Sequence, residues 1–289
     1  GSNHHRNRRS FLKTTSAAAV TAVVTMVPVG NIAYGAALTK AQRDKLTPDQ
    51  IIELMKNGNK RFRLGKESPH DYLAQQKASA KGQYPAAVIL SCIDSRAPAE
   101  MIMDLGIGDT FNARVAGNVS NDDILGSMEF ACKLAGAKVV LVMGHTRCGA
   151  VKGAIDDAQL GNLTGLLGKI RPAVAATKYQ GERSAGNDGF VDAVARTNVE
   201  LTVADIRSRS SVLADLEKSG AIKIVGAMYN LETGVVEFLL LRNSRQPRAT
   251  AQRPLARLGP LRRARSVGVR RHWGYCRSPV LSEQLSFQK

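Results

Sequence analysis

Three features that would assign a function class at once are missing from this 289-residue sequence. It has no internal repeat, no glycine-rich phosphate loop after a strand, and no apolar run long enough to cross a bilayer. The best candidate for such a run, residues 17–29, is interrupted and shorter than the roughly 20 residues that a spanning helix needs. The sequence therefore predicts no membrane span in the mature protein.

Acidic residues are scarce at both ends of the chain. Residues 1–35 have none and carry a net charge of +4, and residues 242–289 have only Glu283 and carry +11. Of the total net charge of +17, only +2 remains for the stretch between them. A nearly neutral body of this size is sufficient for one α/β domain with a sizeable core. Its charge does not favour nucleic-acid binding.

The basic start of the chain predicts a signal peptide over residues 1–37. The basic segment 7–13 precedes the short apolar stretch, and the pair Arg8 and Arg9 resembles a twin-arginine signal, although Asn7 stands where Ser or Thr is usual. The predicted location is therefore periplasmic or otherwise exported. The alternative is a disordered basic tail that leads into a short hydrophobic anchor.

The end of the chain has a different composition from the predicted domain, residues 38–241. Residues 242–289 are rich in Arg, Pro and Ser and lack sustained hydrophobic periodicity. Three interpretations remain open: a disordered basic extension, a contact with nucleic acid or an acidic surface, and out-of-frame translation after a complete domain.

Two apolar runs, residues 86–90 and 138–143, predict buried strands of a parallel sheet. Cys92 follows the first run, and His145 and Cys148 follow the second. In open α/β sheets, ligands bind at the carboxyl ends of the strands. Two thiolates and an imidazole suit zinc, and three protein ligands leave a fourth position for water, as in catalytic zinc sites.

These residues carry a family resemblance. Two segments of this chain, Cys92-x-Asp94-Ser95-Arg96 and His145-x-x-Cys148, resemble the zinc motif of the β-class carbonic anhydrases. Supporting matches are the first-helix motif at 58–62 and the flanking Gly144 and Gly149. The resemblance covers about residues 47–241. It implies one Zn²⁺ per chain, reversible hydration of carbon dioxide to bicarbonate, and a homodimer or higher homo-oligomer.

The resemblance also implies roles for two residues beside the first cysteine. Asp94 would accept a hydrogen bond from the reacting oxygen and orient it, and Arg96 would hold Asp94 in a charge-assisted pair and keep it ionised. If Arg96 released it, Asp94 would become a fourth zinc ligand, as in some family members. The sequence leaves both states open.

Substrate contacts are predicted from the same resemblance at Gln83, Phe111, Phe130 and Gly149. The family motif that usually reads Arg-Asn-x-Ala-Asn or Arg-Asn-Ala-Gly-Asn is Arg-Val-Ala-Gly-Asn at 114–118, and this departure leaves that wall of the pocket undefined. Members with a noncatalytic bicarbonate site have Trp three residues before the first cysteine. The chain has Ile there, so such regulation is not expected.

The alternation of predicted strands and helices indicates a three-layer αβα fold with a mostly parallel central sheet of four to five strands and one antiparallel edge. A helix over 47–63 is expected to turn its apolar stripe to the core or to a partner subunit. The resemblance favours the partner, because in the family this segment reaches across a dimer. The other expected strands are 109–115, 222–229 and 235–241, and the other expected helices are 122–134, 149–157, 164–178 and 188–218.

Two other functions fit the same motifs. Proteins of this fold also hydrolyse carbonyl sulfide or carbon disulfide, and access to the pocket rather than the motif separates these substrates. The chain could also be an exported, non-catalytic zinc-binding protein. The intact Asp94 and Arg96 pair argues against that, because a storage site does not need it.

Overall fold

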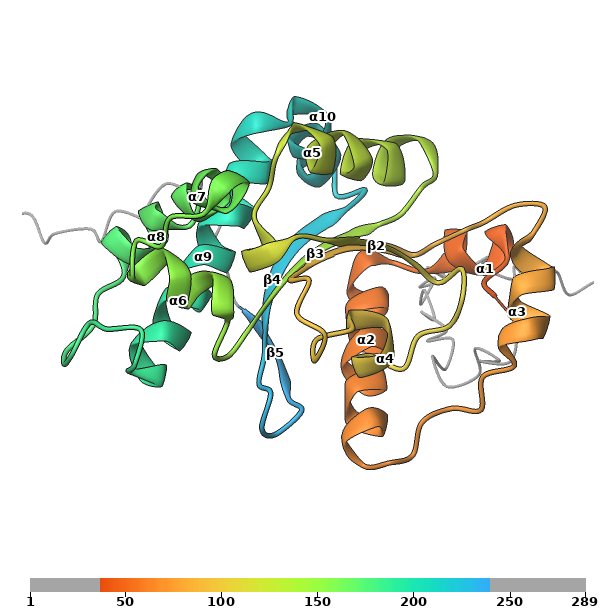
Figure 1. Ribbon diagram of the computed structural model, residues 1–289. Helices are drawn as coiled ribbons and strands as arrows, with labels where there is room; N and C mark the ends of the chain where they lie inside the picture. Colours follow the sequence, from red (N-terminus) through yellow and green to blue (C-terminus); the bar gives the residue numbers. More distant parts are fainter. Residues whose placement is uncertain (1–36, 240–289) are drawn as a thin grey trace, which may run out of the picture. The chain divides into compact units, whose positions relative to one another are not determined.

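A twisted five-stranded sheet forms the centre of the protein (Figure 1). The computed structural model describes residues 37–239, so the predicted signal peptide and the basic tail lie outside the described residues. The strand order is β2-β1-β3-β4-β5. The first four strands are parallel, and β5 pairs antiparallel with β4. The expected mostly parallel sheet with one antiparallel edge is confirmed.

The central strands are buried on both faces, as their uninterrupted apolar runs predict. Every residue of β1 and β3 is buried, whereas β2 at the edge is partly exposed. The hairpin between β4 and β5 turns through 230–235, where Gly234 has a positive φ of 71°. The strands are β1 Ala87–Ser91, β2 Thr110–Arg114, β3 Val139–His145, β4 Lys223–Tyr229 and β5 Val236–Leu239.

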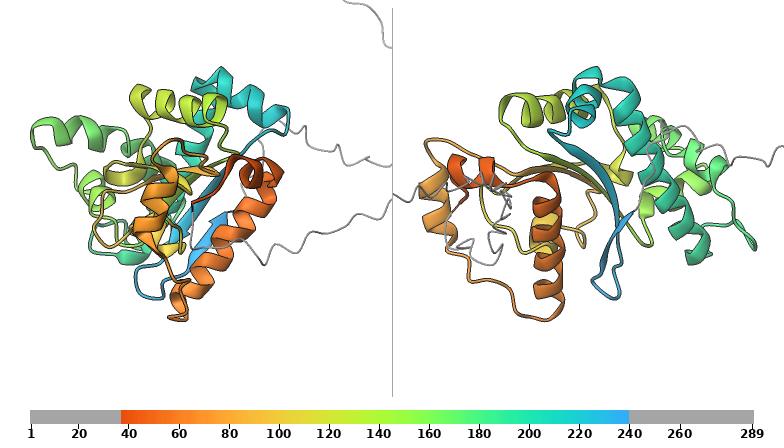
Figure 2. Two further views of the ribbon diagram at one scale, coloured as in Figure 1. Left: turned by 90° about the vertical axis from the view of Figure 1, so that its right-hand side faces the viewer. Right: turned by 180° about the vertical axis from the view of Figure 1, so that it is seen from behind.

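The first four helices cover one face of the sheet (Figure 2). Helix α2 begins with a capping box between Thr47 and Gln50 and has Pro at its first position, the features that predicted it. Its residues Ile51 and Met55 pack in the core beneath the sheet, so the core interpretation of its stripe is confirmed. The four helices are α1 Lys40–Lys45, α2 Pro48–Arg63, α3 Tyr72–Ser79 and α4 Ala99–Ile102.

The buried carboxylate of Asp104 links helix α2 to the segments that follow α2 and α4. Asp104, after α4, accepts hydrogen bonds from Arg61 at 2.5 Å and from Ser68, and its other oxygen lies 2.8 Å from His70 Nε2. Burial opposes ionisation of Asp104, but the hydrogen bonds from Arg61 and His70 outweigh it and hold the pKa of Asp104 below its ordinary value.

The remaining helices cover the other face and enclose the larger core (Figures 1 and 2). The long helix α9 packs directly on β3, where a side chain at Gly144 would meet Val199 Cγ2 at 2.7 Å. Glycine there allows the helix to approach the strand that carries His145. These helices are α5 Asp122–Glu129, continued by a π-turn Phe130–Leu134, then α6 Gly149–Ile155, α7 Gly161–Gly168, α8 Arg171–Ala176, α9 Asp188–Arg209 and α10 Ser211–Lys218.

The structure corrects two expected helices. The segment 164–178 is not one helix, because α7 ends at Gly168 and α8 starts afresh with Pro172 in its first turn. The segment 188–218 breaks at Ser210, whose side chain caps α10 and whose hydroxyl also bonds to Glu129. Helices α1, α3 and α4 were not expected. No helix within 37–239 is both long and apolar enough to span a membrane.

Candidate metal centre and active site

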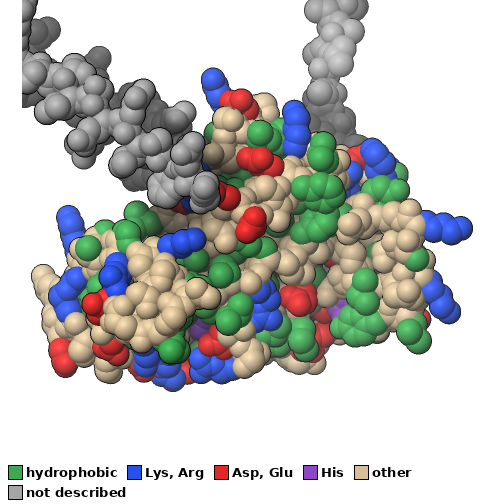
Figure 3. Space-filling model, turned by 45° about the horizontal axis from the view of Figure 1, so that its top comes forward, with side chains coloured by type: hydrophobic (Ala, Val, Ile, Leu, Met, Phe, Trp, Pro, Cys, Tyr) green, Lys and Arg blue, Asp and Glu red, His purple; other side chains and the backbone are tan. Residues whose placement is uncertain are grey.

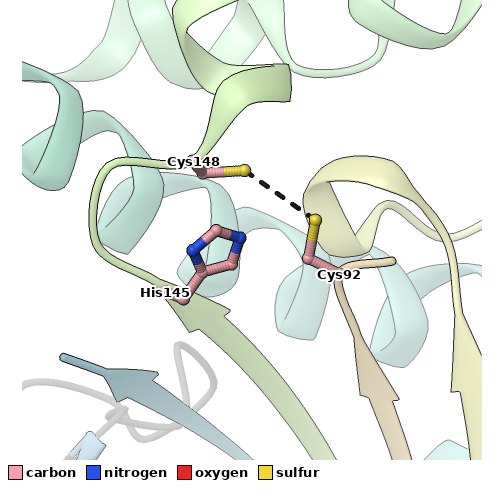
Figure 4. Close-up of side chains that lie close together, drawn as sticks. All are labelled: Cys92, His145 and Cys148. Atoms are coloured by element: carbon pink, nitrogen blue, oxygen red, sulfur yellow. Dashed lines mark hydrogen bonds between the residues drawn. The ribbon is translucent and has the colours of Figure 1, made fainter. Parts of the chain in front are cut away.

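Adjacent strands bring the two metal-binding segments together. β1 and β3 are parallel neighbours, with Ser91 paired to Met143, so both strands end at the same edge of the sheet. Cys92 follows β1, His145 ends β3, and Cys148 caps the following helix α6. The three side chains point towards one another (Figure 4). The structure thus brings together the three residues that the sequence predicts as metal ligands.

The geometry of this cluster suits a metal ion. The donor atoms of the three residues lie within 4.8 Å of one another, and all three side chains are buried. The two sulfur atoms are 3.9 Å apart. His145 Nδ1 donates to the carbonyl of Thr146 at 2.9 Å, which leaves Nε2 buried without a hydrogen-bond partner. A buried, unpaired nitrogen beside two sulfur atoms fits the donor set of a metal site.

The electrostatics favour the same conclusion. The Cys148 thiol 3.9 Å away, together with the neighbouring His145 imidazole and the Gly117 amide, lowers the pKa of Cys92 to about 4. The neighbouring Cys92 and burial raise the pKa of Cys148. Without a cation, only one of two buried sulfurs at this separation therefore ionises readily. A divalent cation held by Cys92 and Cys148 would stabilise both as thiolates.

The segment between His145 and Cys148 is held in an unusual conformation. Arg147 has a positive φ of 53°, which is uncommon for a residue with a long side chain. Its amide donates to Asp192 Oδ1 at 2.7 Å, and its guanidinium pairs with Asp188 at 2.9 Å and with Glu232. These contacts from α9 and the β4–β5 hairpin fix the turn that presents both ligands.

Asp94 and Arg96 form the expected pair beside the cluster. Arg96 Nε and Nη2 donate to the two carboxylate oxygens at 3.0 and 2.8 Å, and the Arg96 amide adds a third bond at 2.9 Å. These bonds hold the pKa of Asp94 well below its usual range. One Asp94 oxygen lies 3.8 Å from His145 Nε2. Asp94 thus rests on Arg96 in this structure, next to the three donors.

Two residues that support Cys92 were not found from the sequence. The Gly117 amide donates to Cys92 Sγ at 3.3 Å, and the side chain of Asn198 donates to the Gly117 carbonyl at 2.8 Å. Gly117 has φ 67°, and a Cβ there would meet Ile170 Cδ1 at 2.5 Å. From the sequence, the segment 114–118 was assigned only to a wall of the substrate pocket, and not to the support of Cys92. Nothing in the sequence links Asn198 to it.

Three residues predicted to contact substrate lie away from this cluster within one chain. Gln83 is exposed and precedes β1, so the strand, about 16 Å long, separates it from Cys92. Phe111 is paired with Val88 near the same end of the sheet. Phe130 contacts Phe111 edge-on, with 6.1 Å between ring centroids.

The other predicted contact, Gly149, directly follows Cys148 as the first residue of α6. No atom lies within 4 Å of where its Cβ would be, so the space over it is open. Cys132 is a packed core thiol, and burial raises its pKa to about 12. Cys276 lies outside the described part of the chain.

Comparison with known proteins agrees with this site. The family model "Carbonic anhydrase" matches residues 87–236. Carbonic anhydrase 2 of Mycobacterium tuberculosis is 38% identical over 193 residues, which cover 65% of this chain and 90% of that protein. A carbonic anhydrase of Mycolicibacterium smegmatis is 33% identical over 196 residues, 66% of this chain and 92% of that protein.

A solved structure gives the class. The β-carbonic anhydrase CafA of Aspergillus fumigatus aligns with a TM-score of 0.52 and 28% identity, covering 57% of this chain and 80% of that one. The fold and the site thus define a lyase with an α/β fold and a Cys-His-Cys cluster that suits zinc. The chain belongs to the β-class carbonic anhydrases and is a carbonate dehydratase.

Proposed function

We propose that this protein hydrates carbon dioxide reversibly with one Zn²⁺ held by Cys92, His145 and Cys148. The observation that carries the proposal is the buried, unpartnered His145 Nε2 facing two sulfurs, with an ionised carboxylate 3.8 Å away. Zinc in this cluster would supply Lewis acidity, which brings the pKa of a bound water towards neutrality. Two thiolates donate more charge than imidazoles would, so the chain's own residues must favour the deprotonated form.

In the proposed mechanism, Asp94 is the residue that favours the deprotonated form of the reacting oxygen. Its carboxylate accepts a hydrogen bond from the reacting oxygen and directs a lone pair of that oxygen towards carbon dioxide. Arg96 occupies both carboxylate oxygens, so it keeps Asp94 ionised and holds its orientation. An ionised carboxylate has no proton to donate, so Asp94 can only accept this hydrogen bond. If Arg96 released it, the Asp94 carboxylate, 3.8 Å from His145 Nε2, could instead hold the metal with the other three residues and exclude water.

One experiment tests the reaction and its main alternative together. Zinc content is measured on the purified chain, and stopped-flow hydration of carbon dioxide is run beside hydrolysis of carbonyl sulfide. We expect one zinc per chain, fast hydration of carbon dioxide and little hydrolysis of carbonyl sulfide. Zinc without either turnover would identify a non-catalytic zinc protein, and turnover of carbonyl sulfide alone would identify the hydrolase.

The proposed assembly is a homodimer through the free edge of β2. β2 is an outer strand among the described ones, and large apolar side chains near it are exposed: Ile93 by 60%, Met101 by 62% and Phe130 by 51%. A second copy on this edge would bring its own Gln83 and Phe111 near the cluster of the first. Gln83 and Phe111 could then contact the substrate at the partner's metal cluster, although they lie far from the cluster of their own chain.

Sedimentation tests the proposed assembly. The wild-type chain should sediment as a dimer or a larger assembly, and Phe130→Glu should shift it to the monomer. A monomeric wild type would refute this part. Nucleic acid is not a proposed partner, because the stretch between the two basic ends carries a net charge of only +2. On the face drawn in Figure 3, Lys and Arg are interspersed with Asp and Glu.

Export to the periplasm is also proposed, from the basic and apolar composition of residues 1–37. Folding and zinc loading before transport would protect Cys92 and Cys148 from oxidation, which gives a physical reason for a twin-arginine route. Changing Arg8 and Arg9 to Lys should retain the precursor in the cytoplasm. Unchanged periplasmic yield on fractionation would refute the assignment.

A further inference from the structure

Arg114 reaches from one strand onto the active-site turn of the next. It is the last residue of β2 and is paired with Ser91, the last residue of β1. Its Nε donates to the carbonyl of Cys92 at 3.0 Å, and its Nη2 donates to the carbonyl of Asp94 at 2.5 Å. One guanidinium therefore holds the backbone of a metal ligand and of the carboxylate beside it.

The other hydrogen bonds at this turn go mainly to its side chains, from Gly117 to Cys92 Sγ and from Arg96 to the Asp94 carboxylate. Ile93, between the two carbonyls, is 60% exposed, so its side chain does not anchor the turn in the core. The backbone contributes the Ala97 amide, which also donates to the Asp94 carbonyl at 3.0 Å. Because a guanidinium is planar and its N–H groups form a rigid fork, it sets the spacing between its two acceptors. A flexible ammonium group would not.

We propose that Arg114 is a positioning residue that holds the turn 92–94 so that the sulfur of Cys92 and the carboxylate of Asp94 face the same point. This inference rests on the proposed zinc site and adds a residue to its support. Arg96 fixes the Asp94 side chain, and Arg114 fixes its backbone. Segment 114–118 thereby acquires a role, since Gly117 in the same segment donates to Cys92 Sγ.

The test compares two arginines that each donate to two backbone carbonyls. Arg183 donates to Thr177 and Val174, both at 2.7 Å, in a region that contributes no residue to the metal cluster. Arg114→Gln and Arg183→Gln each remove such a pair of bonds, so Arg183→Gln is the matched control. The measurements are the rate of zinc release to a chelator, kcat/KM for carbon dioxide hydration, and Tm.

Compared with wild type, Arg114→Gln should either release zinc about ten- to a hundred-fold faster or have a kcat/KM that is lower by the same factor. This is the usual effect of removing a residue that orients metal ligands. Arg183→Gln should leave both within about twofold of wild type, even if Tm falls. Arg114→Lys, which retains the charge but not the fork, should fall between wild type and Arg114→Gln. With Asp94→Asn already present, Arg114→Gln should cost less activity than it does alone.

Wild-type zinc release and turnover in Arg114→Gln would overturn the inference, and so would equal losses in Arg183→Gln. If Arg114→Gln does not fold, Arg114→Lys decides, and wild-type behaviour of that variant would overturn it. Fully additive losses with Asp94→Asn, together with unchanged zinc release, would also refute it. Wild-type protein that binds no zinc would instead refute the proposed function, so the two failures are distinguishable.

Discussion

The role of Asp94 is open to a direct test with Asp94→Asn. The carboxylate receives three hydrogen bonds from Arg96, at 2.8, 2.9 and 3.0 Å, and one of its oxygens lies 3.8 Å from His145 Nε2. An amide of the same shape keeps an acceptor for Arg96 but has no charge to offer the reacting oxygen. The fold and the three metal ligands should therefore be unaffected, and the reaction should be slower.

The size of the effect follows from the bond that is lost. A hydrogen bond to a charged group contributes about 1.5–3 kcal/mol. Since each 1.36 kcal/mol changes a rate tenfold, Asp94→Asn should lose roughly ten- to a hundred-fold in kcat/KM. Arg96→Ala should do comparable harm by freeing Asp94. The double variant should lose less than the sum, because the two residues act as a unit.

The assay is stopped-flow hydration of carbon dioxide, with zinc content measured on the same samples. Glu217→Gln is a matched control, because Arg207 donates to both oxygens of Glu217 at 2.7 Å, outside the metal cluster. It removes a similar ion pair and should leave the rate unchanged. Near-normal turnover by zinc-replete Asp94→Asn would refute the assigned role, and additive losses would show that Asp94 and Arg96 act separately.

Four further predictions concern the metal and the scaffold. Cys148→Ser should lose most of its zinc by elemental analysis, and full retention in the folded variant would contradict the ligand assignment. Asn198→Ala leaves the Gly117 carbonyl unpaired, which should lower the free energy of unfolding by about 1–3 kcal/mol in urea titration; an unchanged value would contradict this. Because the pKa of Asp104 is lowered, its ionised form stabilises the fold at neutral pH, and this contribution is lost as pH falls through that lowered pKa. Asp104→Asn should therefore lower Tm at pH 7, with a difference from wild type that shrinks below the ordinary pKa of 3.8, whereas a constant difference would show that the charge is not responsible. Truncation after residue 241 should leave Tm and turnover near those of the full chain, and a large loss of either would show that the tail docks.

The metal cluster was predictable because each of its parts is a local feature. Each of the two apolar runs is long enough for a strand and is followed by residues of the types that suit zinc. Parallel strands of a sheet present their carboxyl ends at one edge, so Cys92, His145 and Cys148 had to meet once β1 and β3 were neighbours. Asp94 and Arg96 were predictable for the same reason, since they are two residues apart.

Helix boundaries were less predictable, because side chains from elsewhere decide them. Ser210 ends α9 and caps α10, and its hydroxyl bonds to Glu129, which lies 81 residues earlier in the chain. Periodicity alone joined the two helices into one. Helix α4 is only four residues long, which is too short for a periodic pattern to be recognised.

The sequence by itself determined which residues can bind a metal and at which strand ends they stand, because both depend on residue type and local spacing. Only the tertiary structure decided which distant side chains hold these residues in position. Arg114 acts on Cys92 and Asp94 because β2 lies beside β1, and Asn198 reaches Gly117 because α9 packs over that end of the sheet. Such contacts depend on strand order and helix packing, which bring together residues that are distant in the chain.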